Sequence, residues 1–374
     1  MKGGKHRVIK IILVVLVSIV LIVTIGLNLF FRHNLNYDDA LMKEVYKSGF
    51  EENKIILGDA SINYAEGPNN GPPLLLIHGQ GMSWADYDSV LPKLSEKFHV
   101  FSVDVFGHGK SAHDKKLYRL NINGEYLAKF IKEVIGKPTY VTGHSSGGLI
   151  AAWIASEHPD LVEALVLEDP PLFRVTPEEA QEGNKTFAWY EAYVKAHEFL
   201  KQEEQSDYLL YSFENSYFLA QLGGLRDAVV DSAYKYRENN PEGPVKISWL
   251  PASWFRGMYY LDQFDPEFGN AFYTGEWFKN VDQEQMLKNI KVPTIYVKAT
   301  TAYGEDGTLF AANTEEDADK VMKLLENAER INVKSGHSIH FEKPAEFIKF
   351  FFDLLDYDQS NMDLLQCCSR AIFM

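Results

Sequence analysis

A serine between glycines is the residue of this chain whose surroundings point most directly to chemistry. Residues 143–147 read Gly-His-Ser-Ser-Gly, after an apolar run at 139–142 and before a helical run at 148–158. In a strand–turn–helix of this pattern, the serine occupies a sharp, strained turn with its hydroxyl exposed above a sheet. Glycines are needed there because a side chain would collide with the neighbouring strand or helix. We therefore expect Ser145 to be a nucleophile.

A serine nucleophile needs a base, and His337 is the best candidate among 11 histidines. It lies in the loop after the last predicted strand, directly after Gly336, which lets the loop turn the imidazole toward the carboxyl edge of the sheet. His340 is the competitor. It lies one turn closer to the final predicted helix, so we expect it to pack there.

The oxyanion of an acyl-transfer reaction needs backbone donors. Residues 78–81 read His-Gly-Gln-Gly and follow the first long apolar strand, at a turn whose third residue commonly donates its N–H. We therefore expect the N–H groups of Gln80 and Ser146 to form the oxyanion hole, while His78 and Gly79 shape the turn.

Two aspartates compete for the role of the acid that orients the base. Asp306 lies in a loop after the penultimate predicted strand, and Asp169 ends the strand before a long insertion. Asp-Pro at a strand end is often only a structural turn, so the sequence favours Asp306 and keeps Asp169 as the alternative. Glu305 ranks third.

Short apolar runs alternate with helical stretches on both sides of these residues. This alternation predicts an α/β fold with a mostly parallel, doubly wound sheet covered on both faces. The predicted strands are 54–57, 61–64, 74–78, 100–104, 139–142, 164–167, 292–298 and 330–333, and the predicted helices are 84–97, 120–135, 148–158, 317–327 and 344–355.

The alternation stops between residues 172 and 290, where helical periodicity and many aromatic residues replace it. We expect this insertion to be a helical cap between two parts of one core, 50–171 and 291–357, followed by a tail at 358–374. Most of its aromatic residues would fill the core of the cap, and some would line an apolar pocket. Trp84, just after the oxyanion turn, is the aromatic that we most expect at that pocket.

The N-terminal region contains an uncharged apolar run from Ile11 to Phe31, long enough to cross a hydrocarbon core of about 30 Å. It is longer than the apolar part of a signal peptide and lacks a small-x-small cleavage site, so residues 1–33 read as an uncleaved signal anchor. Four basic residues precede the run, which places the N-terminus in the cytoplasm and the large domain outside. Residues 34–49 would form a short stalk.

Charge and cysteine content exclude several other classes. The chain of 374 residues has net charge −15; residues 1–32 carry five basic and no acidic side chains, so −15 minus +5 leaves −20 on the remainder. Such an acidic body repels nucleic acid. The only cysteines, Cys367 and Cys368, have no zinc-binding spacing and are too close for a relaxed disulfide. We expect no metal and no cofactor, because this hydrolysis needs none.

The motifs together resemble the α/β-hydrolase fold superfamily over about residues 50–357. The resemblance rests on four segments in the right order, namely 78–81, 104–111, 143–148 and 336–344. It implies nucleophile, acid and histidine in that chain order, a structural role for Asp104 to Ser111, and a lid formed by the cap. In this family the acid usually follows the penultimate strand within a Gly-x-x-Asp turn, but residues 300–303 occupy that place here, which keeps Asp169 in contention.

A serine nucleophile points away from the dehalogenase and epoxide-hydrolase branches and toward esterases, lipases, thioesterases, aminopeptidase-like enzymes and C–C bond hydrolases. The leading hypothesis is a membrane-anchored serine hydrolase that cleaves an apolar, ester-like bond, with a lipid or acyl ester as the natural substrate class. An aminopeptidase-like or C–C bond hydrolase is the alternative within the enzymes. A catalytically idle binding or scaffold protein is the alternative outside them. The sequence leaves the oligomeric state open.

Overall fold

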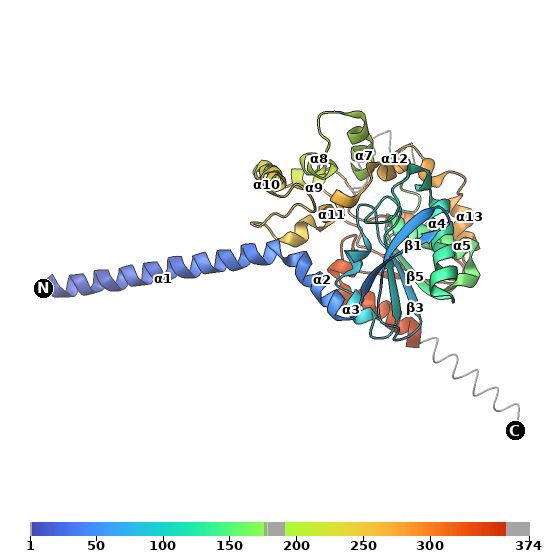
Figure 1. Ribbon diagram of the computed structural model, residues 1–374, viewed down its shortest axis with the longest axis horizontal. Coiled ribbons are helices and arrows are strands. Elements are labelled where there is room, and N and C mark those ends of the chain that lie inside the picture. Colours follow the sequence, from blue (N-terminus) through green and yellow to red (C-terminus); the bar gives the residue numbers. More distant parts are fainter. Residues whose placement is uncertain (1, 176–177, 179–190, 357–374) are drawn as a thin grey trace, which may run out of the picture.

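One mixed sheet forms the centre of the molecule in the computed structural model, which describes residues 2–175, 178 and 191–356 (Figure 1). Its described strands follow the order β1-β2-β4-β3-β5-β6-β7-β8. They are β1 Glu51–Leu57, β2 Ala60–Glu66, β3 Pro73–Ile77, β4 His99–Val103, β5 Thr139–His144, β6 Val162–Glu168, β7 Thr294–Lys298 and β8 Ala328–Asn332. β1 and β2 form an antiparallel hairpin and β2 pairs antiparallel with β4, whereas every further pair is parallel. The predicted mostly parallel sheet is confirmed.

The central strands supply two separate hydrophobic cores. Leu75 and Ile77 of β3 join one core, while Leu74 and Leu76 join the other. Successive side chains of a strand point to opposite faces, so a continuous apolar run buries both faces and requires helices on each. Helices α4 Leu120–Phe130, α5 Ser146–Glu157, α13 Gln283–Asn289 and α14 Glu315–Leu324 contribute to the first core, and α3 Leu91–Leu94 and residues 344–356 to the second.

The predicted helix at 84–97 is wrong in its continuity. The structure divides it into a 3-10 turn, η1 (Trp84–Tyr87), and the short helix α3. Pro92 explains the break, because proline lacks the N–H of a helix interior but fits the first turn of a new helix. The predicted helix at 120–135 is α4 continued by η3 (Ile131–Ile135), which ends at Gly136 with φ 76°.

Helices and irregular segments, with no strand in the described part, make up the stretch between β6 and β7. Its elements up to α13 are α7 Glu191–Lys201, α8 Tyr208–Glu214, α9 Tyr217–Ala220, η6 Gly223–Leu225, α10 Arg226–Asn239, η7 Ala252–Phe255, α11 Arg256–Tyr259, η8 Leu261–Gln263, α12 Pro266–Tyr273 and η9 Glu276–Phe278. A third hydrophobic cluster lies within it, around Phe213, Val229 and Phe255. These helices gather over one end of the sheet (Figure 1), and we call the stretch the cap.

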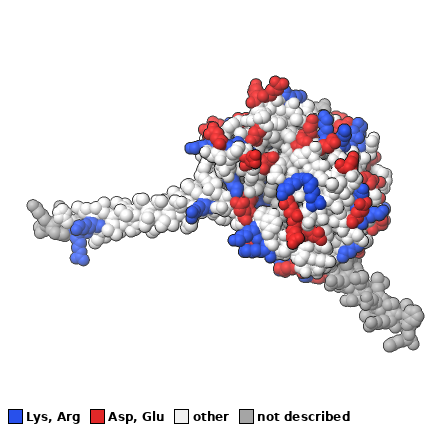
Figure 2. All heavy atoms as spheres, in the orientation of Figure 1, with Lys and Arg blue, Asp and Glu red and all other residues white. Residues whose placement is uncertain are grey.

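A single long helix, α1 (Lys2–Leu35), projects from the body (Figure 1). Its part Ile9–Leu35 is long and apolar enough to cross a membrane, with a hydropathy of 3.0 and none of its most apolar stretch buried against the protein. Figure 2 shows this helix as an uncoloured rod between basic groups at its two ends.

The expected stalk is a docked helix rather than a free tether. Residues Tyr37–Lys47 form α2, whose Val45 is fully buried in the second core and whose Asp38 is also buried. The short helix α15 (Ile339–Glu342) follows the last strand and precedes the helix at 344–356, and two 3-10 turns, η2 (Lys115–Leu117) and η4 (Pro159–Leu161), precede α4 and β6.

Candidate active site

Ser145 lies at the turn between β5 and α5 in a strained backbone conformation, with φ 52° and ψ −121°. Its N–H donates to the carbonyl of Glu168 at 3.0 Å, which holds the turn against the end of β6. A Cβ on Gly143 would lie 2.1 Å from the carbonyl oxygen of Gly147, and one on Gly147 would lie 2.2 Å from that of Ile77. The two glycines are therefore required for this turn, as the sequence predicts.

His337 and Asp169 form a buried pair. The Nδ1 atom of His337 lies 2.7 Å from Oδ2 of Asp169, and both side chains are almost completely inaccessible. Asp169 also accepts from the backbone N–H groups of Ala299, at 3.2 Å, and Ala312, at 3.0 Å. A carboxylate held by two other donors fixes the imidazole with its proton on Nδ1, which leaves Nε2 as the basic atom.

The structure therefore pairs the histidine with Asp169, the alternative acid, and not with the favoured Asp306. Asp306 is exposed, and its carboxylate accepts from the Tyr217 hydroxyl at 3.1 Å and from the N–H of Thr308 at 3.0 Å. The physical reason is that residues 303–309 fold back on themselves as a surface hairpin, closed by a bridge between Tyr303 and Leu309. The loop continues to Ala312, whose N–H donates to Asp169. The loop therefore supports the acid of the pair and does not supply it.

The turn after β3 approaches the nucleophile. A Cβ on Gly79 would lie 3.2 Å from Cβ of Ser145, so the next residue, Gln80, lies beside the elbow. Ser146 is the first residue of α5, where an N–H has no partner within the helix and is free to face a ligand. The residues that carry both expected oxyanion donors, one in the turn after β3 and one in the turn after β5, therefore lie next to Ser145.

Two neutral histidines hold the turn after β3 in place. Nε2 of His78 accepts from the N–H of Val105 at 3.0 Å, and Nε2 of His108 accepts from that of Gly81 at 2.9 Å. Burial lowers the pKa of His78, and it lowers the pKa of His108 still further, so both rings stay uncharged. Asp104 accepts from the N–H of Trp84 at 2.7 Å and serves the same turn, in agreement with a structural role for residues 104–111.

His340, the competing base, is locked in a separate buried ion network. Its Nδ1 lies 2.8 Å from Glu168, and its Nε2 lies 3.3 Å from Asp86. Burial alone would lower its pKa, but the carboxylates of Glu168 and Asp86 outweigh burial and raise the pKa to about 10. His340 is therefore an imidazolium at neutral pH, and its ring contacts that of His144, the residue before Ser145.

Asp86, His144 and His340 are the one described group whose possible metal-ligating atoms lie within 4.8 Å of one another. Both ring nitrogens of His340 already face carboxylates, Nδ1 at 2.8 Å from Glu168 and Nε2 at 3.3 Å from Asp86. His144 is neutral, because burial lowers its pKa to about 3, and its Nε2–H donates to the carbonyl of His337 at 3.1 Å. We therefore assign these residues to positioning of the elbow.

Sequence reasoning missed this network. Its signal is Glu168, a charged residue at the end of a strand that is apolar and buried over the four preceding residues. A buried carboxylate requires a partner, and that requirement points to a second buried ion pair beside Asp169.

The expected pocket role of Trp84 is not supported by its contacts. Its ring packs edge-on against Tyr46 of α2, and its indole N–H donates to Glu52 of β1 at 3.2 Å. Trp84 therefore connects the docked N-terminal helix to the body. Two cap residues, Leu261 and Gly269, lie close to the turn after β3. A Cβ added to Gly81 would lie 3.0 Å from Leu261, and a Cβ added to Gly269 would lie 3.1 Å from Nε2 of Gln80.

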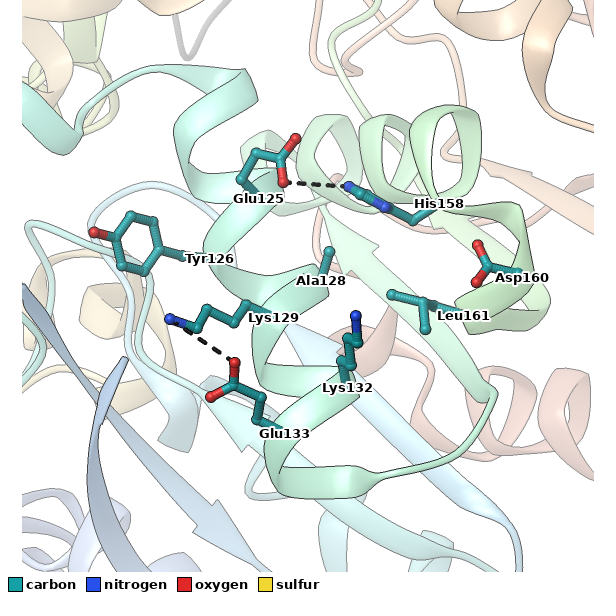
Figure 3. Close-up of a pocket in the computed structure, with 9 residues that line it drawn as sticks. All are labelled: Glu125, Tyr126, Ala128, Lys129, Lys132, Glu133, His158, Asp160 and Leu161. Atoms are coloured by element: carbon teal, nitrogen blue, oxygen red, sulfur yellow. Dashed lines mark ion pairs between the residues drawn. The ribbon is translucent and has the colours of Figure 1, made fainter. Parts of the chain in front are cut away.

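A hollow on the surface lies apart from these residues. Figure 3 shows it between α4 with η3 and the segment 158–161 that joins α5 to β6. It is lined by side chains of both charges, with ion pairs Glu125–His158 at 3.4 Å and Lys129–Glu133 at 3.8 Å. None of its lining residues belongs to the elbow or to the His337–Asp169 pair, so it is not part of the candidate site.

Residues 72–344 match the family model for the alpha/beta hydrolase fold, and the chain belongs to this family. It is 25% identical over 315 residues to a 2-hydroxy-6-oxo-6-(2'-aminophenyl)hexa-2,4-dienoic acid hydrolase of Metapseudomonas resinovorans, which covers 82% of this chain and 91% of that protein. It is 36% identical over 113 residues to an esterase of Mycobacterium tuberculosis, over 30% of this chain and 36% of the esterase.

Two further similarities cover a shorter stretch or are more distant in sequence. A human serine hydrolase-like protein is 31% identical over 124 residues, 31% of this chain, and the match spans only 59% of that protein. The crystal structure of a bacterial membrane phospholipase A superposes with a TM-score of 0.58 at 21% identity, covering 91% of this chain and 97% of that structure. At this identity the likeness supports the fold.

Proposed function

We propose that the chain is a membrane-anchored serine hydrolase that cleaves a carboxylic ester through an acyl-enzyme on Ser145. The observation that carries the proposal is the buried His337–Asp169 pair at 2.7 Å, placed behind a strained serine whose neighbour His144 contacts His337. Strain at a non-glycine residue persists where the surrounding structure enforces it, and it gathers at active sites.

The reaction follows from the roles of these groups. Nε2 of His337 takes the proton of Ser145 as the serine oxygen attacks the ester carbonyl carbon, and Asp169 stabilises the imidazolium through Nδ1–H. The N–H groups of Gln80 and Ser146 hold the oxyanion, each contributing about 3 kcal/mol to the transition state. The tetrahedral intermediate then expels the alcohol, which takes the proton from His337. Water attacks the acyl-enzyme by the same route and releases the acid.

The nucleophile has a direct test. A fluorophosphonate probe is expected to label the wild type and the Ser206→Ala variant, in which an exposed cap serine is removed, but not Ser145→Ala. Equal labelling of Ser145→Ala would refute the assignment.

We further propose that α1 crosses the membrane with the N-terminus in the cytoplasm and the body outside. The support is the apolar span Ile9–Leu35 and the basic residues before it. Protease added to intact cells is expected to degrade the body; a protected body would reverse the orientation.

The second candidate is hydrolysis of an oxo-dienoic acid of the kind named for the M. resinovorans relative. It is favoured by the coverage of that similarity, which extends over most of both chains. The two candidate functions are separated by measuring turnover of p-nitrophenyl esters of increasing acyl chain length and of such an oxo-dienoic acid. Faster turnover of the acid than of every ester would transfer the proposal to this candidate.

A further inference from the structure

The cap touches the end of the apolar helix α1. The side-chain amide of Asn34, in the last turn of α1, donates to the carbonyl of Ser248 at 2.8 Å, and its oxygen accepts from the N–H of Ala252 at 3.3 Å. Figure 1 shows the end of α1 meeting the body beside the segment that leads into α11. Residues 247–255 therefore lie beside the C-terminal end of the apolar part of α1.

This end of α1 falls within the headgroup layer of a bilayer. The uncharged run of α1 ends at Phe31, and Asn34 lies three residues further, a rise of ~4.5 Å along a helix. The headgroup layer extends roughly 5–7 Å beyond the hydrocarbon on each side. If Phe31 marks the edge of the hydrocarbon, the segment in contact with Asn34 lies among the headgroups.

The composition of the segment suits that environment. Residues 247–255 read Ile-Ser-Trp-Leu-Pro-Ala-Ser-Trp-Phe and contain no charge in an otherwise strongly acidic body. Trp254 is 61% exposed, although tryptophan is a residue that soluble surfaces usually cover. Tryptophan is enriched at membrane–water interfaces, where its ring meets the acyl boundary and its N–H meets the headgroups.

Polar contacts on both flanks hold the segment against the end of α1 and against α2. Before it, Lys246 donates to the carbonyl of Leu35 at 3.0 Å and to Asp39 at 2.9 Å. After it, Arg256 is buried between Asp38 of α2, at 3.5 Å, and Asp88 of the body, at 2.9 Å. Separating the cap from the N-terminal helices would leave a buried guanidinium without one of its partners, which is strongly unfavourable.

We propose that residues 248–254 form a membrane-contacting surface between the buried Ile247 and Phe255, with the exposed Trp254 inserted in the headgroup layer of a phospholipid bilayer. The surface leads toward the site, because the same chain continues to Leu261, which lies against the oxyanion turn. A substrate that enters along this segment comes from the bilayer, and membrane-resident lipid esters are therefore the substrate class. This assignment of a substrate rests on the proposed hydrolase function.

Lipid contact is tested with the full chain in phosphatidylcholine vesicles, with and without bromine on the upper acyl chain. The chain has six tryptophans, and none lies in residues 1–47, so the anchor itself adds no signal. Brominated lipid is expected to quench part of the tryptophan emission of the wild type and a clearly smaller part in Trp254→Phe. Equal quenched fractions in the two proteins would overturn the contact.

Substrate delivery is tested by activity on a phospholipid in vesicles and on a short-chain soluble ester. Trp254→Ser is expected to lose activity several-fold on the vesicles and to keep it on the soluble ester. Ile56→Ser is the matched control, because it removes an apolar side chain that is 73% exposed but lies far from the proposed surface. Ile56 is in the β1–β2 hairpin, two residues from Gly58, and Gly58 lies beside α4, on the side of the body away from α1 (Figure 1). Equal losses on both substrates would overturn delivery. If the wild type hydrolyses neither substrate, the proposed function fails, while the quenching experiment still decides whether the surface meets lipid.

Discussion

At the scale of single residues, backbone strain marks the two ends of the proposed triad. Ser145 has φ 52° and Asp169 has φ 41°, and both are non-glycine residues at the carboxyl ends of neighbouring strands. A left-handed conformation costs energy for such residues, so the surrounding hydrogen bonds must enforce it. At Asp169 the enforcing contacts are the donors Ala299 and Ala312 and the ring of His337.

The choice of acid gives a prediction at this scale. Asp169→Asn is expected to lower kcat for ester hydrolysis by roughly 10⁴-fold, because an amide at this position no longer holds His337 in the required tautomer. Asp306→Asn is the matched control and should change kcat little, since that carboxylate is exposed and bonded to Tyr217. Steady-state kinetics on a p-nitrophenyl ester decide the matter, and a large loss at Asp306 with none at Asp169 would restore the sequence-based preference.

The sequence could not choose between these aspartates for a geometric reason. Both follow strands of one parallel sheet, and the carboxyl ends of such strands meet at the same edge, where either side chain is within range of His337. What decides is the path of residues 300–312, which form a hairpin in place of a short Gly-x-x-Asp turn. That path depends on contacts with the distant cap residue Tyr217, which no local pattern encodes.

At the scale of elements, local patterns predicted the strands well and the packing of helices less well. β3 is a continuous apolar run, and β5 and β7 are rich in β-branched and aromatic residues, so all three strands are predictable from residue type alone. The break at Pro92 and the docking of α2 were missed. α2 has a polar average composition, and only tertiary contacts at Val45 and Asp38 show that one of its faces is buried.

The ion network between η1, β6 and α15 gives a second prediction. The pKa of His340 is raised from near 6.5 to about 10 in the folded protein, so its imidazolium stabilises the fold fully below about pH 6.5. That contribution is lost as the pH rises toward 10. His340→Gln, which cannot carry the charge, should therefore be less stable than the wild type at pH 6, and the difference should shrink toward pH 10.

Urea unfolding from pH 6 to 10 measures this effect. The control is His113→Gln, because His113 is exposed and its replacement should leave the stability profile unchanged. A stability difference between the wild type and His340→Gln that is constant across this range would show that His340 is not charged in the folded protein.

At the scale of the whole molecule, the N-terminal helices have two separable roles. α1 is an apolar rod with no buried residue in its most apolar stretch, so the body does not need it for its core. α2 belongs to the body, because Val45 is fully buried and Asp38 is paired with Arg256, a cap residue that also contacts Asp86 and Asp88. α2, the cap and the segment at η1 are thus connected through one buried guanidinium.

Two truncations separate these roles. A chain that begins at residue 36 keeps α2 and should fold with a Tm close to that of the full chain and hydrolyse a soluble ester at a similar rate. A chain that begins at residue 49 loses Val45, whose burial is worth about 1.5–3 kcal/mol, and leaves Arg256 without Asp38, so its Tm should fall markedly. Asp38→Asn in the longer truncate isolates the second effect and should lower the Tm by an intermediate amount. Thermal unfolding followed by circular dichroism measures the full chain and the three shorter proteins, and equal Tm values for the two truncates would show that α2 is only the short stalk that the sequence predicts.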